Sequence, residues 1–421
     1  MGRAGRQAFE TFGTEPLVGA GTNQLTLRMN SLPPLQSGSV CYLVGAGLSA
    51  ASLYQVPVAA RFFSRTFGKQ YGARMAKVDL TTADPRLNSL LDRLEREYGP
   101  LDTLDLETVM ADLHVRAFGI GFAWETQGFV APTSRPIPEL RHDYDLLLHY
   151  ISERLPWLNE SSPICEKVKA FVDLIRPEDS VITLNYDTTL EFHLHKCKGE
   201  SGHHLSHLES SLAAPWTRLD SAAAPVFSLA GPSCTRGVLT KLHGSKDWYT
   251  CPNDFCPNRH HIHPWSMWFR GSPRPTGETI PQCTQCGSSR RMVIIPPTAS
   301  KAFDEFPKLG VMWAQSFEAF RWSQRWCLIG VSLARSDFHL STFLRSLSRV
   351  TFGSLNLGAF PTICIVDTKP RGVANRLAEA MAPLPQAALR RGSIPIYTFR
   401  SIKKFLSFAA ASDQRPPPGG S

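Results

Sequence analysis

Four cysteines stand in two close pairs, at the spacing of a metal site. Cys251 and Cys256 are followed, after twenty-six residues, by Cys283 and Cys286, and a glycine comes directly after the last cysteine. This arrangement is typical of a zinc ribbon, in which four thiolates surround one tetrahedral Zn²⁺. The first spacing is wide, so the alternative is a ligand set in which a nearby histidine replaces one cysteine: His260, His261 or His263. We predict a structural zinc site at the four cysteines, with no open position for catalysis.

A glycine turn follows the first apolar run of the chain. Residues 39–44 have the continuous apolar character of a buried parallel strand, and the next positions include Gly45, Ala46, Gly47 and Ser49. Glycines permit close backbone approach, so N–H groups at the start of the following helix can meet a pyrophosphate, and the serine adds a hydroxyl donor. A purely structural strand-to-helix turn is the alternative interpretation.

The sequence lacks the acidic residue that a hydride-transferring dehydrogenase needs. Such enzymes hold the adenosine ribose with an Asp or Glu about twenty residues after the glycine turn. No acidic residue occurs between Ala46 and Val78. This absence argues against a simple nicotinamide dehydrogenase.

Polar residues also follow two later predicted strands. Asn185 and Asp187 come after the apolar run that begins at Ser180, and His243 precedes a glycine after another short run. Open α/β sheets collect ligand-binding residues at strand ends, and an imidazole there can act as a base. Each residue also has a plainer interpretation: the Asn or Asp caps the next helix, and the histidine is a satisfied turn residue.

Strands alternate with helices along most of the chain. The fold class that we predict is α/β, a Rossmann-like doubly wound parallel sheet with a helical insertion and a zinc-ribbon insertion. Apolar spacing of helical period places the helical insertion at about 68–178, and the cysteines place the zinc ribbon at about 246–293. The predicted organisation is completed by an N-terminal extension (1–37), one main domain (38–408) and a disordered tail (409–421).

Composition limits the class of protein. The chain has 43% hydrophobic and 19% charged residues, as a globular protein with a large core does. A net charge of +9 allows a nucleic-acid partner, but the basic residues are spread along the chain and do not favour one. No apolar run approaches about eighteen residues, and the first residues do not resemble a signal peptide, so we expect no membrane association and a cytoplasmic location. The six other cysteines are scattered singly, unlike those of a secreted disulfide framework.

Four motifs, taken together and in order, resemble the sirtuin superfamily. They lie at 45–49, 183–191, 242–245 and 329–337, within a pattern that spans about 39–370. The stretch 107–113 resembles a helix of the sirtuin helical insertion, and 294–301 with Trp313 resembles the NAD-hydrolysing branch. Sirtuins also carry a zinc ribbon after their His-Gly turn.

The resemblance implies an NAD-consuming site. NAD would lie across the switch point of the sheet, with its phosphates on the turn at 45–49 and the nicotinamide ribose between Asn185 and His243. Asn185 would orient water, and His243 would hold or deprotonate a ribose hydroxyl. The other residues expected to bind NAD are Asp187 and, along its adenosine half, Gly330, Ser332 and Asp367.

Two departures from the deacetylases favour water as the acceptor. The Gly-Ile-Pro-Asp-Phe-Arg stretch of deacetylating sirtuins is replaced here at 55–62, and Asn185 is followed by Tyr186 and Asp187 where deacetylases have Ile-Asp. We therefore predict an NAD glycohydrolase that releases nicotinamide and ADP-ribose. The resemblance further implies bacterial antiviral defence by NAD depletion, with a homo-oligomer and a partner sensor or effector protein. The alternatives are an NAD-dependent protein deacylase and a non-catalytic nucleotide-sensing or nucleic-acid-associated module.

Overall fold

The computed structural model describes the sheet, its helices and the cysteine module. Its described residues are 39–53, 56, 59, 62–63, 85–120, 136–156, 158, 162–176, 178–198, 239–253, 255–264, 282–295, 306–334, 337–353, 361–382, 394 and 396–413. The predicted N-terminal extension, most of the replaced stretch at 55–62, and positions 296–301 of the stretch at 294–301 lie outside these residues.

Six parallel strands form the main sheet, in the order β3-β2-β1-β7-β8-β9. Their bounds are β1 Val40–Val44, β2 Ser180–Thr183, β3 Leu239–Lys241, β7 Arg325–Ile329, β8 Thr362–Val366 and β9 Ile396–Phe399. Strand β1 pairs in parallel with β2 on one side and with β7 on the other. The order of the strands reverses between β1 and β7, which makes this pair the switch point of a doubly wound sheet. The predicted fold class is confirmed.

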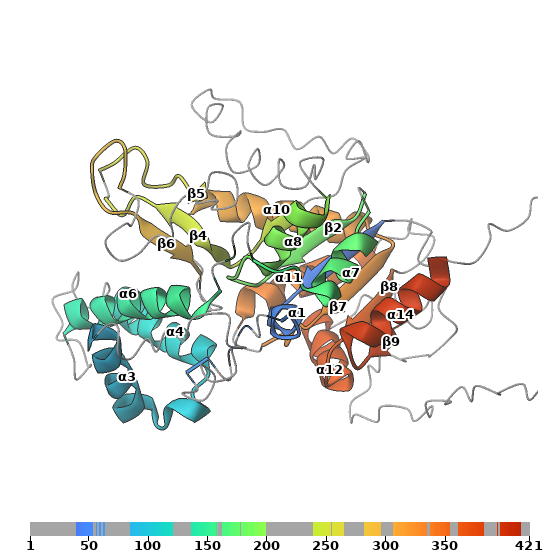
Figure 1. Ribbon diagram of the computed structural model, residues 1–421, viewed down its shortest axis with the longest axis horizontal. Helices are drawn as coiled ribbons and strands as arrows, with labels where there is room; N and C mark the ends of the chain where they lie inside the picture. Colours follow the sequence, from blue (N-terminus) through green and yellow to red (C-terminus); the bar gives the residue numbers. More distant parts are fainter. Residues whose placement is uncertain are drawn as a thin grey trace, which may run out of the picture.

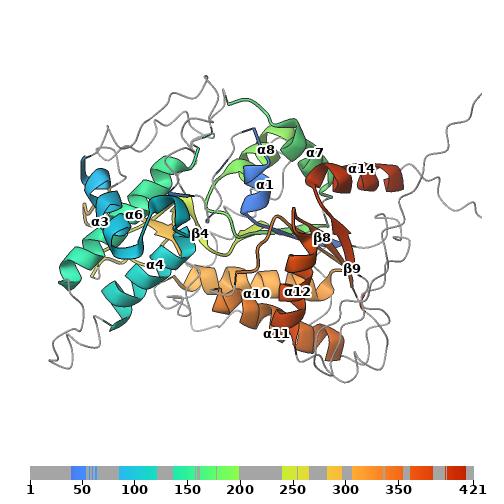
Figure 2. The same ribbon diagram turned by 90° about the horizontal axis from the view of Figure 1, so that it is seen from below.

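Helices cover both faces of the sheet, and Figure 2 shows the two layers. Residues alternate along β1: Cys41 and Leu43 face one cluster, while Val40, Tyr42 and Val44 face the other. Because both faces are buried, nearly every residue of a central strand must be apolar, and this explains the continuous apolar runs. The first cluster is covered by α10 (Pro307–Trp322), α11 (Phe338–Gly353) and α12 (Pro370–Met381), and the second by α7 (Glu166–Leu174), α8 (Thr189–Lys198) and α14 (Ile402–Asp413).

A group of helices packs around a core of its own beside the sheet (Figure 1). It contains α3 (Pro85–Tyr98), the 3₁₀ turn η3 (Leu101–Thr103), α4 (Leu106–His114), the π-helical turn η4 (Val115–Ile120) and α6 (Ile137–Arg154). Arg93 of α3 binds the buried Asp143 of α6 through two hydrogen bonds, of 3.2 and 2.5 Å. Helix α7, which the sequence analysis included in the helical insertion, packs instead on the sheet.

The cysteine module is a small antiparallel sheet of order β5-β4-β6. Its strands are β4 Gly244–Thr250, β5 His263–Pro264 and β6 Arg291–Ile294. Strand β4 begins directly after His243, so the module is connected to the end of the main sheet where the predicted site lies.

The C-terminal helix runs past the predicted start of the tail. Helix α14 continues to Asp413 because Phe405 and Ala409 are buried, and residues 414–421 lie outside the described residues. None of the helices that the structure describes is long and apolar enough to cross a membrane.

Candidate active site and metal centre

The predicted binding residues follow the carboxyl ends of the parallel strands. Gly45 follows β1, Asn185 comes shortly after β2 and His243 shortly after β3. On the other side of the switch point, Gly330 follows β7 and Asp367 follows β8. Because the strands are parallel, these positions share one edge of the sheet, where ligands of doubly wound folds bind.

Two glycine turns pack against each other at the switch point. The Gly45 N–H donates to the Ile329 carbonyl at 2.9 Å, and the Gly47 N–H donates to the Gly330 carbonyl at 3.0 Å. A Cβ on Gly47 would lie 2.6 Å from the Cα of Gly330, and Gly330 itself has a φ of +60°. Contact between the two backbones therefore requires these glycines whether or not a ligand is bound.

The glycine turn keeps one open backbone donor. The Gly45 and Gly47 N–H groups are used within the protein, whereas no hydrogen bond from the Ala46 N–H occurs among the described residues. Ala46 is the first residue of the short helix α1 (Ala46–Ala50). Of the N–H groups from Gly45 to Gly47, that of Ala46 is thus the one without a backbone acceptor among the described residues.

Asn185 is held in one orientation by acceptors on both sides. Its Nδ2 donates to the Gly45 carbonyl at 3.1 Å and to Ser49 Oγ at 3.0 Å. The Ser49 hydroxyl gives its single proton to Asp187 Oδ1 at 3.0 Å, so towards Asn185 it can only accept. The amide must therefore turn its NH₂ group inward, and no donor to Asn185 Oδ1 occurs among the described residues.

Asp187 is buried and is linked to Asn185 through the Ser49 hydroxyl. Its Oδ1 also accepts from the Thr189 N–H at 2.9 Å, at the start of α8. Its backbone carbonyl accepts from Lys241 Nζ at 2.7 Å, and that ammonium pairs with the buried Glu191. Burial raises the pKa of Glu191, and the Lys241 charge opposes this effect. These contacts make Asp187 a residue that positions Ser49 and the turn around it.

His243 faces a carboxylate that sequence reasoning did not assign. Its Nε2 lies 2.9 Å from Asp337 Oδ2, and both side chains are buried. The other oxygen of Asp337 accepts from the Leu340 N–H at 3.0 Å and so caps α11. The ring of Tyr186 lies 6.2 Å from that of His243 between centroids. A carboxylate at this distance stabilises positive charge that develops on the imidazole.

Two of the predicted residues stand apart from the Asn185 network. Ser332 is exposed, and its carbonyl accepts from Arg376 Nε at 2.6 Å. Asp367 is half-buried, and its Oδ1 accepts from the Lys369 N–H at 2.7 Å, just before α12. Neither side chain bonds to Asn185, Ser49 or Asp187 within the described part of the chain.

The four cysteines meet at one end of the small sheet. Their Sγ atoms all lie within 4.8 Å of one another, with 3.4 Å between Cys251 and Cys286 and 3.6 Å between Cys256 and Cys283. Four thiolates around Zn²⁺ would be about 3.8 Å apart, given Zn–S bonds of about 2.3 Å and tetrahedral geometry. The donor set and its spacing therefore fit a zinc ion, and no histidine belongs to the cluster among the described residues.

Backbone geometry around the cysteines suits bound thiolates. The Asn258 N–H donates to Cys256 Sγ at 3.4 Å, and backbone N–H groups lower the pKa of Cys283 to about 6, whereas desolvation raises the pKa of Cys251 and of Cys256. Gly287, directly after the last cysteine, has a φ of +72°, the left-handed conformation that glycine adopts without steric cost. The module is thus preformed for four-thiolate coordination.

Two signals for the missed residues exist in the sequence. Asp337 comes directly before a helix pattern, and an acidic residue there predicts a cap, but nothing local shows that its second oxygen reaches His243. Lys241 and Glu191 are charged residues within apolar surroundings, which indicates a buried pair without naming the partners.

Comparisons with known proteins gave distant structural neighbours. No family model matches the chain, and no curated protein matches it. A solved structure described as "Structural Basis for the Mechanism and Regulation of Sir2 Enzymes" is 13% identical, over 90% of this chain and 95% of that chain, with a TM-score of 0.39. A mutant Sir2 homologue in complex with 2'-O-acetyl ADP ribose is 14% identical over the same shares, also with a TM-score of 0.39. The structural neighbours are thus Sir2 structures, while the fold assignment rests on the sheet topology of this chain.

Proposed function

We propose that this chain is a sirtuin-like NAD glycohydrolase, which cleaves the nicotinamide–ribose bond with water to give nicotinamide and ADP-ribose. The observation that carries the proposal is the fixed amide of Asn185. Its NH₂ group is bound inward by Gly45 and Ser49, so its Oδ1 is the atom left to accept a hydrogen bond at the carboxyl edge of the sheet.

An outward amide oxygen suits the reaction. Cleavage of the N-glycosidic bond passes through an oxocarbenium-like state, which needs a fixed ribose and a well-placed water more than a strong nucleophile. In the proposal, Asn185 Oδ1 accepts a hydrogen bond from that water. The water oxygen bonds to the ribose carbon, nicotinamide leaves with the bonding electron pair, and one proton is released.

His243 supplies the base in this scheme. It accepts the proton of a ribose hydroxyl as positive charge grows on the sugar, and Asp337 stabilises the resulting imidazolium. The added water then gives a proton back to this hydroxyl, and the imidazolium releases the one net proton of the reaction. The Ala46 N–H would face the phosphates, while Gly330, Ser332 and Asp367 would line the adenosine half. The Ser49 hydroxyl, expected from the sequence to be a further donor to the phosphates, instead gives its proton to Asp187. Asp187 acts through Ser49 as a positioning residue.

The cysteine cluster complements this site as a structural zinc centre in the proposal. All four thiolates are ligands, which leaves no coordination position for water. The metal would fix the ends of β4 and β6, and β4 begins beside His243.

The direct test is to incubate the purified chain with NAD and measure nicotinamide and ADP-ribose. We expect turnover without any acyl-lysine peptide, and a loss of about 10²-fold or more in Asn185→Ala and His243→Ala. Matched controls are Asn88→Ala on α3 and His142→Ala on α6, which should keep the native rate. Turnover only with an acylated peptide would favour a deacylase, and NAD binding without any turnover would favour a nucleotide-sensing module.

We infer antiviral defence by NAD depletion as the cellular role, with a homo-oligomer, a partner protein and a cytoplasmic location as accompanying predictions. The test is expression in bacteria with NAD levels followed over time. Toxicity should accompany NAD loss and disappear in both Asn185→Ala and His243→Ala. Equal toxicity of the native chain and these variants would show that NAD depletion is not its cause.

A further inference from the structure

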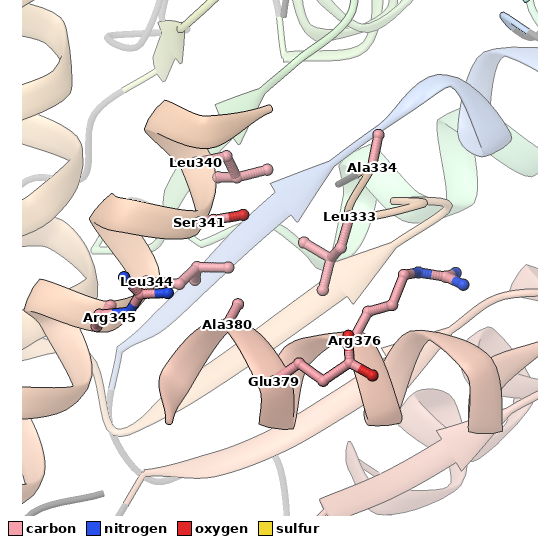
Figure 3. A pocket seen from close by; sticks show the side chains of 9 residues that line it. All are labelled: Leu333, Ala334, Leu340, Ser341, Leu344, Arg345, Arg376, Glu379 and Ala380. Carbon is pink, nitrogen blue, oxygen red and sulfur yellow. The ribbon is translucent and has the colours of Figure 1, made fainter. Parts of the chain in front are cut away.

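A pocket lies between α11 and α12, on the far side of the loop that follows β7 (Figure 3). Its cavity volume is about 230 Å³. At roughly 30 Å³ for each water molecule, this space would hold a small metabolite but not a dinucleotide. None of the residues proposed to face NAD lines this pocket. Gly330 and Ser332 lie in the same loop as Leu333, which does line it.

The inner wall of the pocket is apolar. It is formed by Leu333 from the loop, Leu340 and Leu344 from α11, and Ala380 from α12, and the three leucines are buried. Leu333 has a φ of +49°, a conformation rarely adopted by residues other than glycine, and its side chain forms part of the pocket wall. An apolar body, such as a planar ring, fits this surface.

Two arginines stand at opposite ends of the pocket in the view of Figure 3. The Nε of Arg345 is buried and has no hydrogen-bond partner among the described residues. The Nε of Arg376 donates to the Ser332 carbonyl at 2.6 Å, and its guanidinium makes no other hydrogen bond within the described part of the chain. A buried donor without a partner, such as Arg345 Nε, costs free energy, and an anionic group would satisfy it.

We propose that this pocket binds a small molecule with an apolar body and one anionic group, a phosphate or a carboxylate. The Ser341 hydroxyl, which lines the same space, adds a neutral hydrogen-bonding group. Glu379, at the rim, disfavours ligands of high negative charge. The pocket thus favours a partly apolar ligand with a single anionic group over inorganic polyanions.

The pocket is connected to the candidate active site through one loop. The Gly330 carbonyl holds the Gly47 N–H, and two residues later the Ser332 carbonyl holds Arg376. A ligand that engages Arg376 and packs on Leu333 stabilises this loop conformation. This second step rests on the proposed function, since it predicts a lower KM for NAD when the pocket is filled, by about fivefold or more.

The binding test uses the full chain without NAD, titrated with phenyl phosphate, benzoate and the uncharged benzyl alcohol, by calorimetry. We expect one molecule of an anionic probe per chain and no binding of benzyl alcohol. Arg345→Gln should weaken binding about tenfold or more, because a hydrogen bond to a charged group is lost. The matched control is Arg349→Gln, an exposed arginine on the same helix outside the pocket.

Three results would overturn the proposal: no binding of either anion, equal binding by Arg345→Gln, or displacement of the probe by NAD. A second variant, Ser341→Leu, fills the pocket and should abolish binding even if Arg345 also has a structural role. Asn185→Ala should bind the probe normally, so a failed NAD hydrolase and a failed pocket give different results. If the probes bind and KM for NAD does not change, the connection through the loop is wrong.

Discussion

At the scale of single residues, the orientation of the Asn185 amide decides what the candidate site can do. Both of its neighbours, the Gly45 carbonyl and the Ser49 hydroxyl, are acceptors towards it. An aspartate in its place would have the same shape but would point acceptors at acceptors, close to the Asp187 carboxylate.

Asn185→Asp should therefore lower stability as well as NAD turnover. We expect the free energy of unfolding to fall by about 2 kcal/mol, the cost of buried polar groups that lose their partners. Denaturant unfolding measures this value, with Asn88→Asp on the partly exposed face of α3 as the control. A stable Asn185→Asp chain would mean that the amide faces the other way.

Gly330 is the second residue on which the site depends. Its φ of +60° and a Cβ position 2.5 Å from the Cα of Gly47 leave no room for a side chain. Gly330→Ala should cost about 3 kcal/mol of unfolding free energy, from strain and from displacement of the glycine turn.

The matched control is Gly310→Ala in α10, where an added Cβ meets nothing within 4 Å. This change should stabilise the chain by up to about 1 kcal/mol, because alanine favours a helix over glycine. Thermal unfolding of the two variants compares them directly. Equal melting temperatures would contradict the backbone contact at the switch point.

At the scale of elements, the small sheet depends on its metal ion. We expect one zinc ion per chain by elemental analysis, and its removal by a chelator should raise hydrogen exchange in β4 and β6. The core strands β1 and β7 should stay protected, since each is hydrogen-bonded to strands of the main sheet on both sides. Cys256→Ser should lose the metal, whereas Cys197→Ser, outside the cluster, should keep it. Unchanged exchange after metal removal would show that the small sheet folds without zinc.

A buried histidine links α7 and α8 and gives the fold a pH dependence. His193 Nε2 accepts from the Cys165 N–H at 2.9 Å, and Nδ1 lies 2.7 Å from the Thr189 carbonyl, so the ring fits its site when neutral. Burial lowers the pKa of His193, and burial likewise lowers that of His114 in α4.

The sign of the effect follows from these lowered pKa values. The unfolded chain takes up the protons first, so the stability present above about pH 6.5 is lost as the pH falls towards the lower folded pKa. His193→Gln should flatten the fall in unfolding free energy below pH 6.5. The exposed His142→Gln is the control and should leave the pH profile unchanged. A profile of His193→Gln as steep as the native one would exclude this histidine as a cause.

At the scale of the whole molecule, sequence patterns predicted the strands of the sheet better than the positions of the helices that pack on them. Strands such as β1 and β8 are buried on both faces, so their apolar runs are plain in the sequence. The cysteine cluster was predictable because metal ligands keep fixed spacing. Helical periodicity shows that α7 has an apolar face but does not say which layer covers it, and the helix lies on the sheet.

The contacts between distant segments could not be read from the sequence. The pairing of His243 with Asp337 depends on how the end of β3 lies relative to the start of α11. The Gly45 and Gly47 N–H groups are bonded to the carbonyls of Ile329, at the end of β7, and of Gly330, which follows it. No local pattern around Gly45 predicts these acceptors. Local patterns report propensity and burial, while such pairs are fixed by the assembled sheet.

The position of β1 between β2 and β7 also bears on how the chain is made. Strand β1 is among the first described segments to be synthesised, yet its second neighbour begins only at Arg325. Until then one edge of β1 has no strand beside it, and the loop that holds the Gly47 N–H does not exist. A chain that stops before Ile329 therefore cannot build the switch point, so the candidate site forms only late in synthesis.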